Sequence, residues 1–333
     1  MNKALRWLAL IVFVVAASWL LDRQEFAPHP SAHPAPSAQP ALAAPGATSA
    51  PQPAHSRPAG ARVVCQPLRS AILRRRVNVC ALLPPGYARH AHRRYPVLFY
   101  LPGLGGNAEE LIQTQAWMLI DELWARRQLP PFLIISADSF NSFYVNAYDG
   151  RMNYENFFMR ELLAWERHHF RTLPGRRNRA LLGISMGGYG ALHLAFKYPR
   201  RFGSVSAHSA MLLRRPPVQA VEDSLSAARL RYLGRIFGMP PNLRFWERNS
   251  PFTLAQSRRH LAGLAIEFDC GEQDGYGFER GALQLHRRLV RLGVPHEFHL
   301  YPGGHTWNYF AARLPGALAF AAAHFGRPPS RTQ

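Results

Sequence analysis

The chain has 333 residues, of which 47% are hydrophobic and 18% are charged. This balance excludes a disordered or collagen-like chain and allows a large hydrophobic core. The formal net charge is +20, but only Lys3 and Lys197 among the 40 basic residues are lysines. The arginines lie in short groups between the predicted elements, without a nucleic-acid motif or a single basic helix, so we predict a solvated basic surface and no nucleic-acid partner. Attraction to anionic envelope polymers, lipid headgroups or acidic substrates stays open.

Residues 1–26 predict a signal peptide or an N-terminal membrane anchor. Lys3 and Arg6 precede residues 7–21, a run of 15 residues without charge, and Asp22-Arg23 follow this run. A basic flank before a short apolar run is typical of a secretory leader, but bulky residues follow the small ones at Ala16-Ala17-Ser18, so the cleavage site is not clean. We expect a periplasmic or secreted protein, with residues 7–21 either removed or kept as a tether to the inner membrane.

Residues 27–61 predict a disordered linker between the leader and the rest of the chain. They hold nine prolines and twelve alanines in 35 positions and almost no aliphatic side chains. Proline-rich chain is extended and semi-rigid. Residues 62–328 then form one domain in which strand and helix patterns alternate, and this alternation predicts an α/β fold with a mostly parallel central sheet and helices on both faces.

A disulfide is predicted near the start of this domain. Cys65 and Cys80 fall on two β-like runs, 61–67 and 76–83, and a hairpin centred between Ile72 and Leu73 would place them opposite each other. Opposite positions bring Cβ atoms close enough for a bond, which an oxidising compartment permits. Cys270 has no partner in this scheme and is expected to be a small buried residue.

The most informative segment is Gly183-Ile184-Ser185-Met186-Gly187, between an apolar strand at 179–182 and a helix at 189–195. A G-x-S-x-G sequence in this setting predicts a nucleophile elbow, because glycines on both sides of the serine permit a sharp, strained turn without Cβ collisions. Ser185 is therefore the predicted nucleophile. The turn also brings a helix N-terminus, with unpaired N–H groups and a partial positive charge, beside the atom where negative charge develops in acyl transfer.

An elbow predicts an acid and then a histidine later in the chain, each in a loop after a strand. The strand predicted at 264–268 runs into a loop that offers Asp269 and Asp274, and the strand predicted at 296–300 ends just before Gly303-Gly304-His305. A general base needs such a loop position to place its ring against the serine, while a carboxylate fixes its tautomer. His305 is the predicted base. Asp274 is favoured as the acid because Asp269, at the strand end, can simply cap the turn.

Residues 212–262 form a long connection that predicts a cap. Its stretch 221–237 has a helical pattern, Met239-Pro240-Pro241 ends that pattern, and Phe245-Trp246 offer aromatic rings that could cover a pocket.

Taken together, these segments resemble the esterase D-like family of the α/β-hydrolase superfamily, which includes S-formylglutathione hydrolases, feruloyl esterases and antigen 85 acyltransferases. The similarity covers most of residues 62–326. It rests on separated motifs in the family order: residues 82–87, 95–106, 183–190, Tyr198-Pro199 with Phe202, 269–274 and 301–307.

The resemblance implies Ser185 as nucleophile, Asp274 as acid and His305 as base. It also implies an oxyanion hole made by the backbone N–H groups of Met186 and of Leu104, in the glycine-rich loop after the apolar strand 95–101. Many relatives carry His-Gly at that bend, where this chain has Pro102-Gly103.

A family-like loop precedes the helix expected around residue 161. In relatives the equivalent loop approaches the nucleophile, so Tyr144 and Asn146 are candidates to line the substrate pocket, with simple packing as an equal alternative.

The predicted function is that of a serine esterase acting through an acyl-enzyme on a small-molecule or envelope ester, without a cofactor or metal. An envelope acyltransferase using the same residues and a non-catalytic binding module are the alternatives. The acyl and alcohol groups and the oligomeric state stay open.

Overall fold

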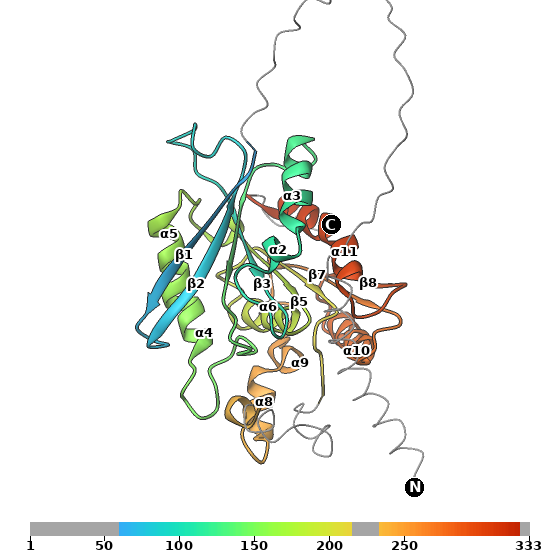
Figure 1. The fold of residues 1–333 in the computed structure, drawn as a ribbon. Coiled ribbons are helices and arrows are strands. Elements are labelled where there is room, and N and C mark those ends of the chain that lie inside the picture. The colour runs from blue at the N-terminus through green and yellow to red at the C-terminus, as the bar shows by residue number, and fades with distance from the viewer. Residues whose placement is uncertain (1–59, 215–232, 327–333) are drawn as a thin grey trace, which may run out of the picture. The chain divides into compact units, whose positions relative to one another are not determined.

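In a computed structural model of the protein, residues 60–214 and 233–326 are described (Figure 1). Within them, eight strands form one sheet in the order β1-β2-β4-β3-β5-β6-β7-β8. The strands are β1 (Arg62–Ser70), β2 (Arg75–Leu83), β3 (Val97–Leu101), β4 (Leu133–Ala137), β5 (Arg179–Ile184), β6 (Ser204–His208), β7 (Ala265–Gly271) and β8 (Glu297–Tyr301). The pairs β1-β2 and β2-β4 are antiparallel and all others are parallel, so the predicted α/β fold with a mostly parallel sheet is confirmed.

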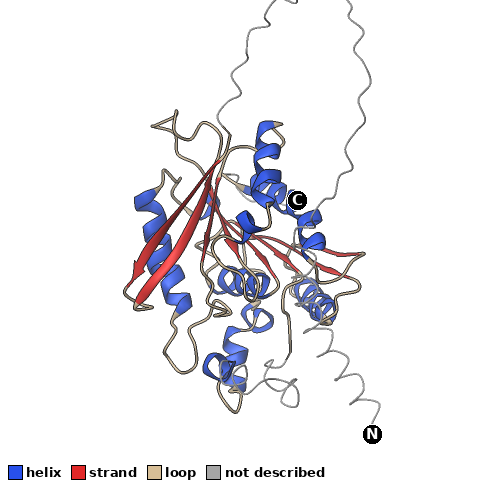
Figure 2. Cartoon of the chain, viewed as in Figure 1, coloured by secondary structure: helices blue, strands red, loops and turns tan. Residues whose placement is uncertain are grey.

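Helices cover both faces of the sheet (Figure 2). They are α2 (Glu110–Gln113), α3 (Ala116–Ala125), α4 (Tyr154–Asn156), α5 (Leu163–His169), α6 (Met186–Lys197), α8 (Leu243–Asn249), α9 (Pro251–Leu254), α10 (Phe278–Arg291) and α11 (Trp307–His324), with a π-helical turn at Phe157–Leu162 and a 3-10 turn at Arg176–Asn178. Side chains alternate along each strand. On β3, Leu98 and Tyr100 pack in the cluster that contains α3 and α11, whereas Phe99 and Leu101 pack in the cluster that contains α6 and α10.

The domain begins with the predicted hairpin. β1 pairs with β2 so that Cys65 lies opposite Cys80, and a disulfide joins the two residues. Glu161 ties the hairpin turn to the helical layer, because its Oε1 accepts the N–H groups of Ala71 and Ile72, each at 3.0 Å. Cys270 is buried, as predicted.

The described part of the predicted cap is joined to α6. Residues 215–232, which hold most of the helix predicted at 221–237, lie outside the described residues. The backbone oxygen of Asn249, the last residue of α8, accepts hydrogen bonds from Tyr189 OH at 2.9 Å and from His193 Nδ1 at 2.8 Å. Trp246 stacks on Tyr189 with a ring separation of 5.9 Å. α8 is thus fixed to the helix that follows the elbow.

The described residues contain no helix that is both long and apolar enough to cross a membrane. The predicted leader, residues 1–26, and the predicted linker up to residue 59 lie outside the described residues.

Candidate active site

Ser185 lies at the sharp turn between β5 and α6, with φ 54° and ψ −118°. Its N–H donates to His208 O at 2.9 Å, and its carbonyl oxygen accepts Tyr189 N–H at 3.0 Å and Met211 N–H at 3.1 Å. A positive φ is unfavourable for a residue with a side chain and persists only where the surroundings fix it. The backbone of Ser185 is therefore held between β6 and the first turn of α6.

The two glycines of the motif are required by close approach. A Cβ on Gly183 would lie 2.1 Å from Gly187 O, and a Cβ on Gly187 would lie 1.8 Å from Leu101 O. Neither position can accept a side chain without moving the backbone of β3 or α6. Gly103 lies next to the serine, since a Cβ there would be 3.7 Å from Ser185 Cβ.

Asp274 and His305 form a hydrogen-bonded pair. His305 Nδ1 donates to Asp274 Oδ2 at 2.8 Å, and Tyr276 N–H donates to Asp274 Oδ1 at 3.0 Å. Burial opposes ionisation of this carboxyl, but the hydrogen bonds from His305 and Tyr276 outweigh it, so the pKa of Asp274 lies below its usual value. The pair is thus an ionised carboxylate and an imidazole with Nδ1 protonated, which leaves Nε2 for a second partner.

The loops after β7 and β8 place this pair. Glu272 N–H donates to Tyr301 O at 2.9 Å, and Gln273 N–H donates to Gly303 O at 3.0 Å. Because β5, β7 and β8 are parallel strands of one sheet, the loops that follow them lie at the same edge. Ser185, Asp274 and His305 are the residues that these three loops present there.

Asp269 has different partners. It lies inside β7, which extends to Gly271 and not only to the predicted end at 268. Its Oδ2 accepts His208 Nδ1 at 2.6 Å and its Oδ1 accepts Tyr309 OH at 2.7 Å, both in the buried layer between the sheet and α11. Both oxygens are therefore bound away from His305.

The glycine-rich loop after β3 leaves the amide of Leu104 free. Pro102 has no N–H, and the amides of Gly105 and Gly106 donate to Asn141 Oδ1 at 2.6 Å and to Gly103 O at 3.1 Å. The Gly103 N–H interacts with the carboxyl of Glu110 and favours its charged form. Among the described residues, the N–H of Leu104 has no acceptor.

Met186 offers a second free amide. It is the first residue of α6, and the first helical hydrogen bond is donated only by Tyr189, to Ser185 O. Helix N-termini leave such N–H groups unpaired. In the described part of the chain, Met186 and Leu104 are thus available donors on either side of the elbow.

Tyr144 and Asn146 have partners inside the protein. Tyr144 is 1% exposed, and its OH donates to Pro102 O at 2.9 Å, behind the glycine-rich loop. Asn146 Oδ1 accepts Asn156 N–H at 3.0 Å. These contacts match the packing alternative, and contact of either side chain with a substrate stays a prediction.

Two contributors to the site carry no sequence signal of their own. Ser209 follows β6 with a positive φ of 39°, and its Oγ accepts Gly271 N–H at 3.5 Å beside the acid loop. Glu110 lies under the glycine-rich loop. Serines and glutamates are common in loops and helix starts, so only the three-dimensional arrangement identifies these two.

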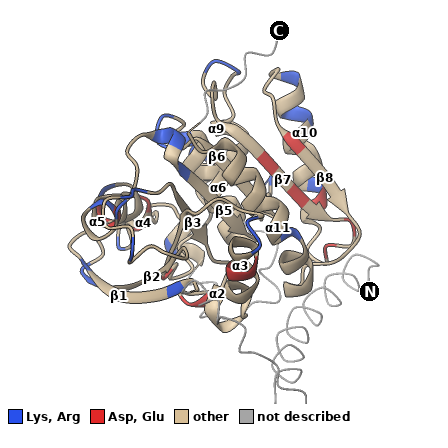
Figure 3. Cartoon of the chain, turned by 90° about the horizontal axis from the view of Figure 1, so that it is seen from above, with Lys and Arg blue, Asp and Glu red and all other residues tan. Residues whose placement is uncertain are grey.

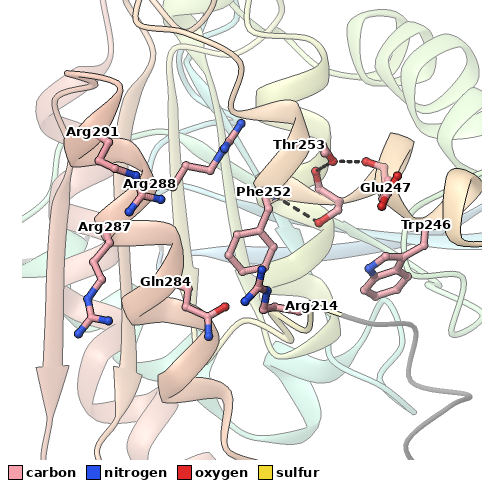
Figure 4. A pocket seen from close by; sticks show the side chains of 10 residues that line it. Arg214, Trp246, Glu247, Phe252, Thr253, Gln284, Arg287, Arg288 and Arg291 are labelled. Carbon is pink, nitrogen blue, oxygen red and sulfur yellow. Dashed lines mark hydrogen bonds between the residues drawn. The ribbon is translucent and has the colours of Figure 1, made fainter.

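A hollow whose lining does not include Ser185, Asp274 or His305 lies elsewhere among the described residues (Figure 4). It measures about 540 Å³ and lies between α8, α9 and α10. Four arginines line it together with Trp246, Phe252 and one acid: they are Arg214, Arg287, Arg288 and Arg291, with Glu247 as the acid. We call this the arginine hollow.

The sheet order and an elbow after the central strand β5 define an α/β-hydrolase fold. Residues 70–321 match the family described as "Putative esterase", and the chain belongs to this family. An esterase of Mycobacterium tuberculosis (strain ATCC 25618 / H37Rv) is 32% identical over 266 residues, 73% of this chain and 55% of the relative, so the chain spans about half of that relative's length. An acetyl esterase of Caldicellulosiruptor saccharolyticus is 24% identical over 261 residues, 75% of this chain and 94% of the relative.

Solved structures show the same fold. A ferulic acid esterase superposes with a TM-score of 0.68 at 23% identity, covering 80% of this chain and 99% of the other. An S-formylglutathione hydrolase from Agrobacterium tumefaciens gives 0.63 at 19% identity, covering 80% and 96%. MPT51 of Mycobacterium tuberculosis gives 0.62 at 16% identity, covering 79% and 99%. The family match and the mycobacterial relative, together with this shared fold, confirm the predicted resemblance to the esterase D-like family.

Proposed function

We propose that the protein is a serine ester hydrolase that works through an acyl-enzyme. The observation that carries the proposal is the pair of Asp274 and His305 at the sheet edge where the elbow presents Ser185. Membership of an esterase family supports ester cleavage as the reaction.

In the proposed reaction, His305 Nε2 takes the proton of Ser185 Oγ as the oxygen attacks the ester carbonyl. The carbonyl oxygen becomes negatively charged and is held by the N–H groups of Leu104 and Met186. His305 then gives its proton to the leaving alcohol, and an acyl-serine remains. Water, deprotonated by His305, releases the acid and restores the serine. Asp274 keeps the imidazole oriented and stabilises its charge.

Ser185→Ala tests the proposal. We expect hydrolysis of a short-chain p-nitrophenyl ester to fall by at least about three powers of ten, because the nucleophile is lost. A fluorophosphonate should label the wild-type protein on Ser185, located by peptide mass spectrometry, and should not label the variant. Thermal unfolding followed by circular dichroism should show that the variant is folded. Unchanged turnover in a folded variant would contradict the proposal, and absence of labelling would favour a non-catalytic module.

The same assay separates hydrolysis from acyl transfer. A competing alcohol or sugar hydroxyl in the reaction would yield a new ester if the acyl-enzyme excludes water. We propose hydrolysis as the main course, so free acid should dominate the products.

We also propose that the domain works outside the cytoplasm, as a periplasmic or secreted protein, with residues 7–21 as its export signal or tether. The Cys65–Cys80 disulfide supports this, because such bonds persist in oxidising compartments. Alkylation of both thiols in periplasmic material without reductant would contradict it.

A further inference from the structure

A carboxyl group lies directly beneath the loop that carries Leu104. Glu110 begins α2, its Oε1 accepts Tyr100 OH at 2.7 Å, and its carboxyl also interacts with the Gly103 N–H. A Cβ on Gly106 would lie 1.8 Å from Glu110 Oε2, so the carboxyl packs against the backbone of the loop. The loop therefore rests on this side chain.

Nothing in the described residues balances a negative charge at this position. None of the ion pairs there includes Glu110. The titratable groups that face it are the phenols of Tyr100, on β3, and of Tyr144. Burial raises the pKa of Glu110 to about 7, although the hydrogen bonds from Tyr100 and Gly103 oppose the rise. The carboxyl thus changes its charge near neutral pH.

We propose that Glu110 is a positioning residue that supports the Leu104 N–H in its neutral form, and that its negative charge suppresses ester hydrolysis. This inference rests on the proposed function, because it requires an oxyanion at Leu104. In the neutral form one oxygen still accepts the Gly103 N–H, and the protonated oxygen shares a hydrogen bond with Tyr100.

Two effects of ionisation compete at this loop. A carboxylate binds the Gly103 N–H about twice as strongly as a neutral acceptor does. That bond, however, is made equally before and during the reaction, so it does not accelerate the chemical step. A negative charge beneath the loop that holds the developing oxyanion repels it only in the transition state, and at the effective dielectric of a protein the repulsion costs on the order of tenfold in rate. The repulsion therefore outweighs the stronger hydrogen bond, and ionisation of Glu110 lowers the rate.

Glu110→Gln keeps the oxygen that accepts the Gly103 N–H and replaces the titrating O–H with an NH2 group. We expect kcat/KM of this variant to equal that of the wild type near pH 6 and to exceed it by roughly tenfold at pH 8.5, where the wild-type carboxyl is ionised. Glu109→Gln is the matched control, because Glu109 is its exposed neighbour, and its profile should follow the wild type.

Tyr100→Phe distinguishes titration from a simple loss of support. It removes a hydrogen bond that favours the carboxylate, so the decline of activity should move to higher pH without disappearing. A purely structural role would instead lower the activity of both variants at every pH.

A measurement without substrate completes the test. Since the folded-state pKa of Glu110 lies above its ordinary value of 4.5, the folded protein holds a proton that the unfolded chain releases, and the free energy of unfolding should fall as pH rises from 4.5 to 7. Urea unfolding of Glu110→Gln should lack this fall. Two results would overturn this inference alone. One is an equal dependence of the free energy of unfolding on pH in the wild type and in Glu110→Gln. The other is that the pH profiles of kcat/KM of these two proteins coincide while both activities still depend on Ser185. Loss of Ser185 dependence in the wild type would overturn the proposed function and this inference with it.

Discussion

At the scale of single residues, two buried aspartates five positions apart have different roles in and near the site. Asp274 binds His305, whereas both oxygens of Asp269 are bound by His208 and Tyr309. The sequence favours Asp274 because a residue deeper in the loop can reach across to the next strand end. The partners of Asp269 could not be predicted, since they come from β6 and α11 and meet only when the sheet is assembled.

Asp274→Asn should lower kcat by about three to four powers of ten, because Asn donates to the imidazole and stabilises the wrong tautomer. Asp269→Asn is the matched comparison. It leaves His208 without its carboxylate partner, so it should lower the free energy of unfolding by about 2 to 4 kcal/mol while kcat stays within about threefold. Steady-state kinetics and urea unfolding of both variants check this. If Asp269→Asn lowered kcat more than Asp274→Asn does, Asp269 would be the catalytic acid and Asp274 the structural one.

The sequence could not decide whether Tyr144 and Asn146 contact a substrate or pack inside the protein. An aromatic residue before a helix can face a substrate or pack inside, and nothing local separates these cases. The close contact with Gly190, where a Cβ would lie 2.1 Å from the Tyr144 ring, reveals the packing only in three dimensions.

At the scale of elements, one buried carboxylate joins α4 to α6, and a histidine links it to α8. Glu155 accepts His193 Nε2 at 2.9 Å and Lys197 Nζ at 2.8 Å, and Tyr198 OH also donates to it. His193 Nδ1 is hydrogen-bonded to Asn249 O, so the ring connects Glu155 to α8. Burial opposes ionisation, but these donors lower the pKa of Glu155 to about 2. The described part of the cap is therefore held to the helix after the elbow through this buried hydrogen-bond network.

Glu155→Gln should remove a pH-dependent part of the stability. Because the folded-state pKa lies below the ordinary 4.5, the contribution is complete above about pH 5 and is lost as pH falls towards 2. A shift of this size corresponds to roughly 2 to 4 kcal/mol at neutral pH. Urea unfolding between pH 2 and 7 should show a smaller dependence on pH in the variant. Glu122→Gln, at an exposed ion pair of α3, should change stability by less than about 0.5 kcal/mol. Parallel pH curves for wild type and Glu155→Gln would contradict this account.

Strands and the elbow were predictable because apolar runs and glycine pairs act locally. The strands β3, β5, β7 and β8 lie within a few residues of their expected places. The antiparallel placement of β2 beside β4 could not be predicted from the sequence, because it depends on which strand edges the parallel part of the sheet leaves free.

At the scale of the whole molecule, the excess of arginine is spread over many elements (Figure 3). In the arginine hollow, four arginines and one acid line the same concave surface. In the described residues none of these arginines has an ion pair. A concave surface of one sign raises the local concentration of anions.

A double variant of the arginine hollow, Arg287→Gln/Arg291→Gln, should therefore bind a sulfated polysaccharide column more weakly than the wild type. The decrease should be larger than for a variant that loses the same two charges elsewhere. Arg69→Gln/Arg76→Gln, on facing positions of the β1-β2 hairpin, removes the same two charges and is the control. The hollow variant should elute at distinctly lower salt than the control, and the difference should vanish above about 0.5 M salt, where surface charges are screened. Equal elution of the two variants would mean that the charge acts diffusely.

The Cys65–Cys80 bond has a consequence for anyone who makes this protein. β1 is one of the two edge strands of the sheet, and its neighbour β2 would present an open row of backbone donors and acceptors if β1 came away. Recombinant protein produced in a reducing cytosol would lack the disulfide that links β1 to β2. The exposed edge of β2 could then pair with a strand of another copy. Two preparations with identical sequence could thus differ in shelf life and in their tendency to precipitate, depending only on the redox history of the host.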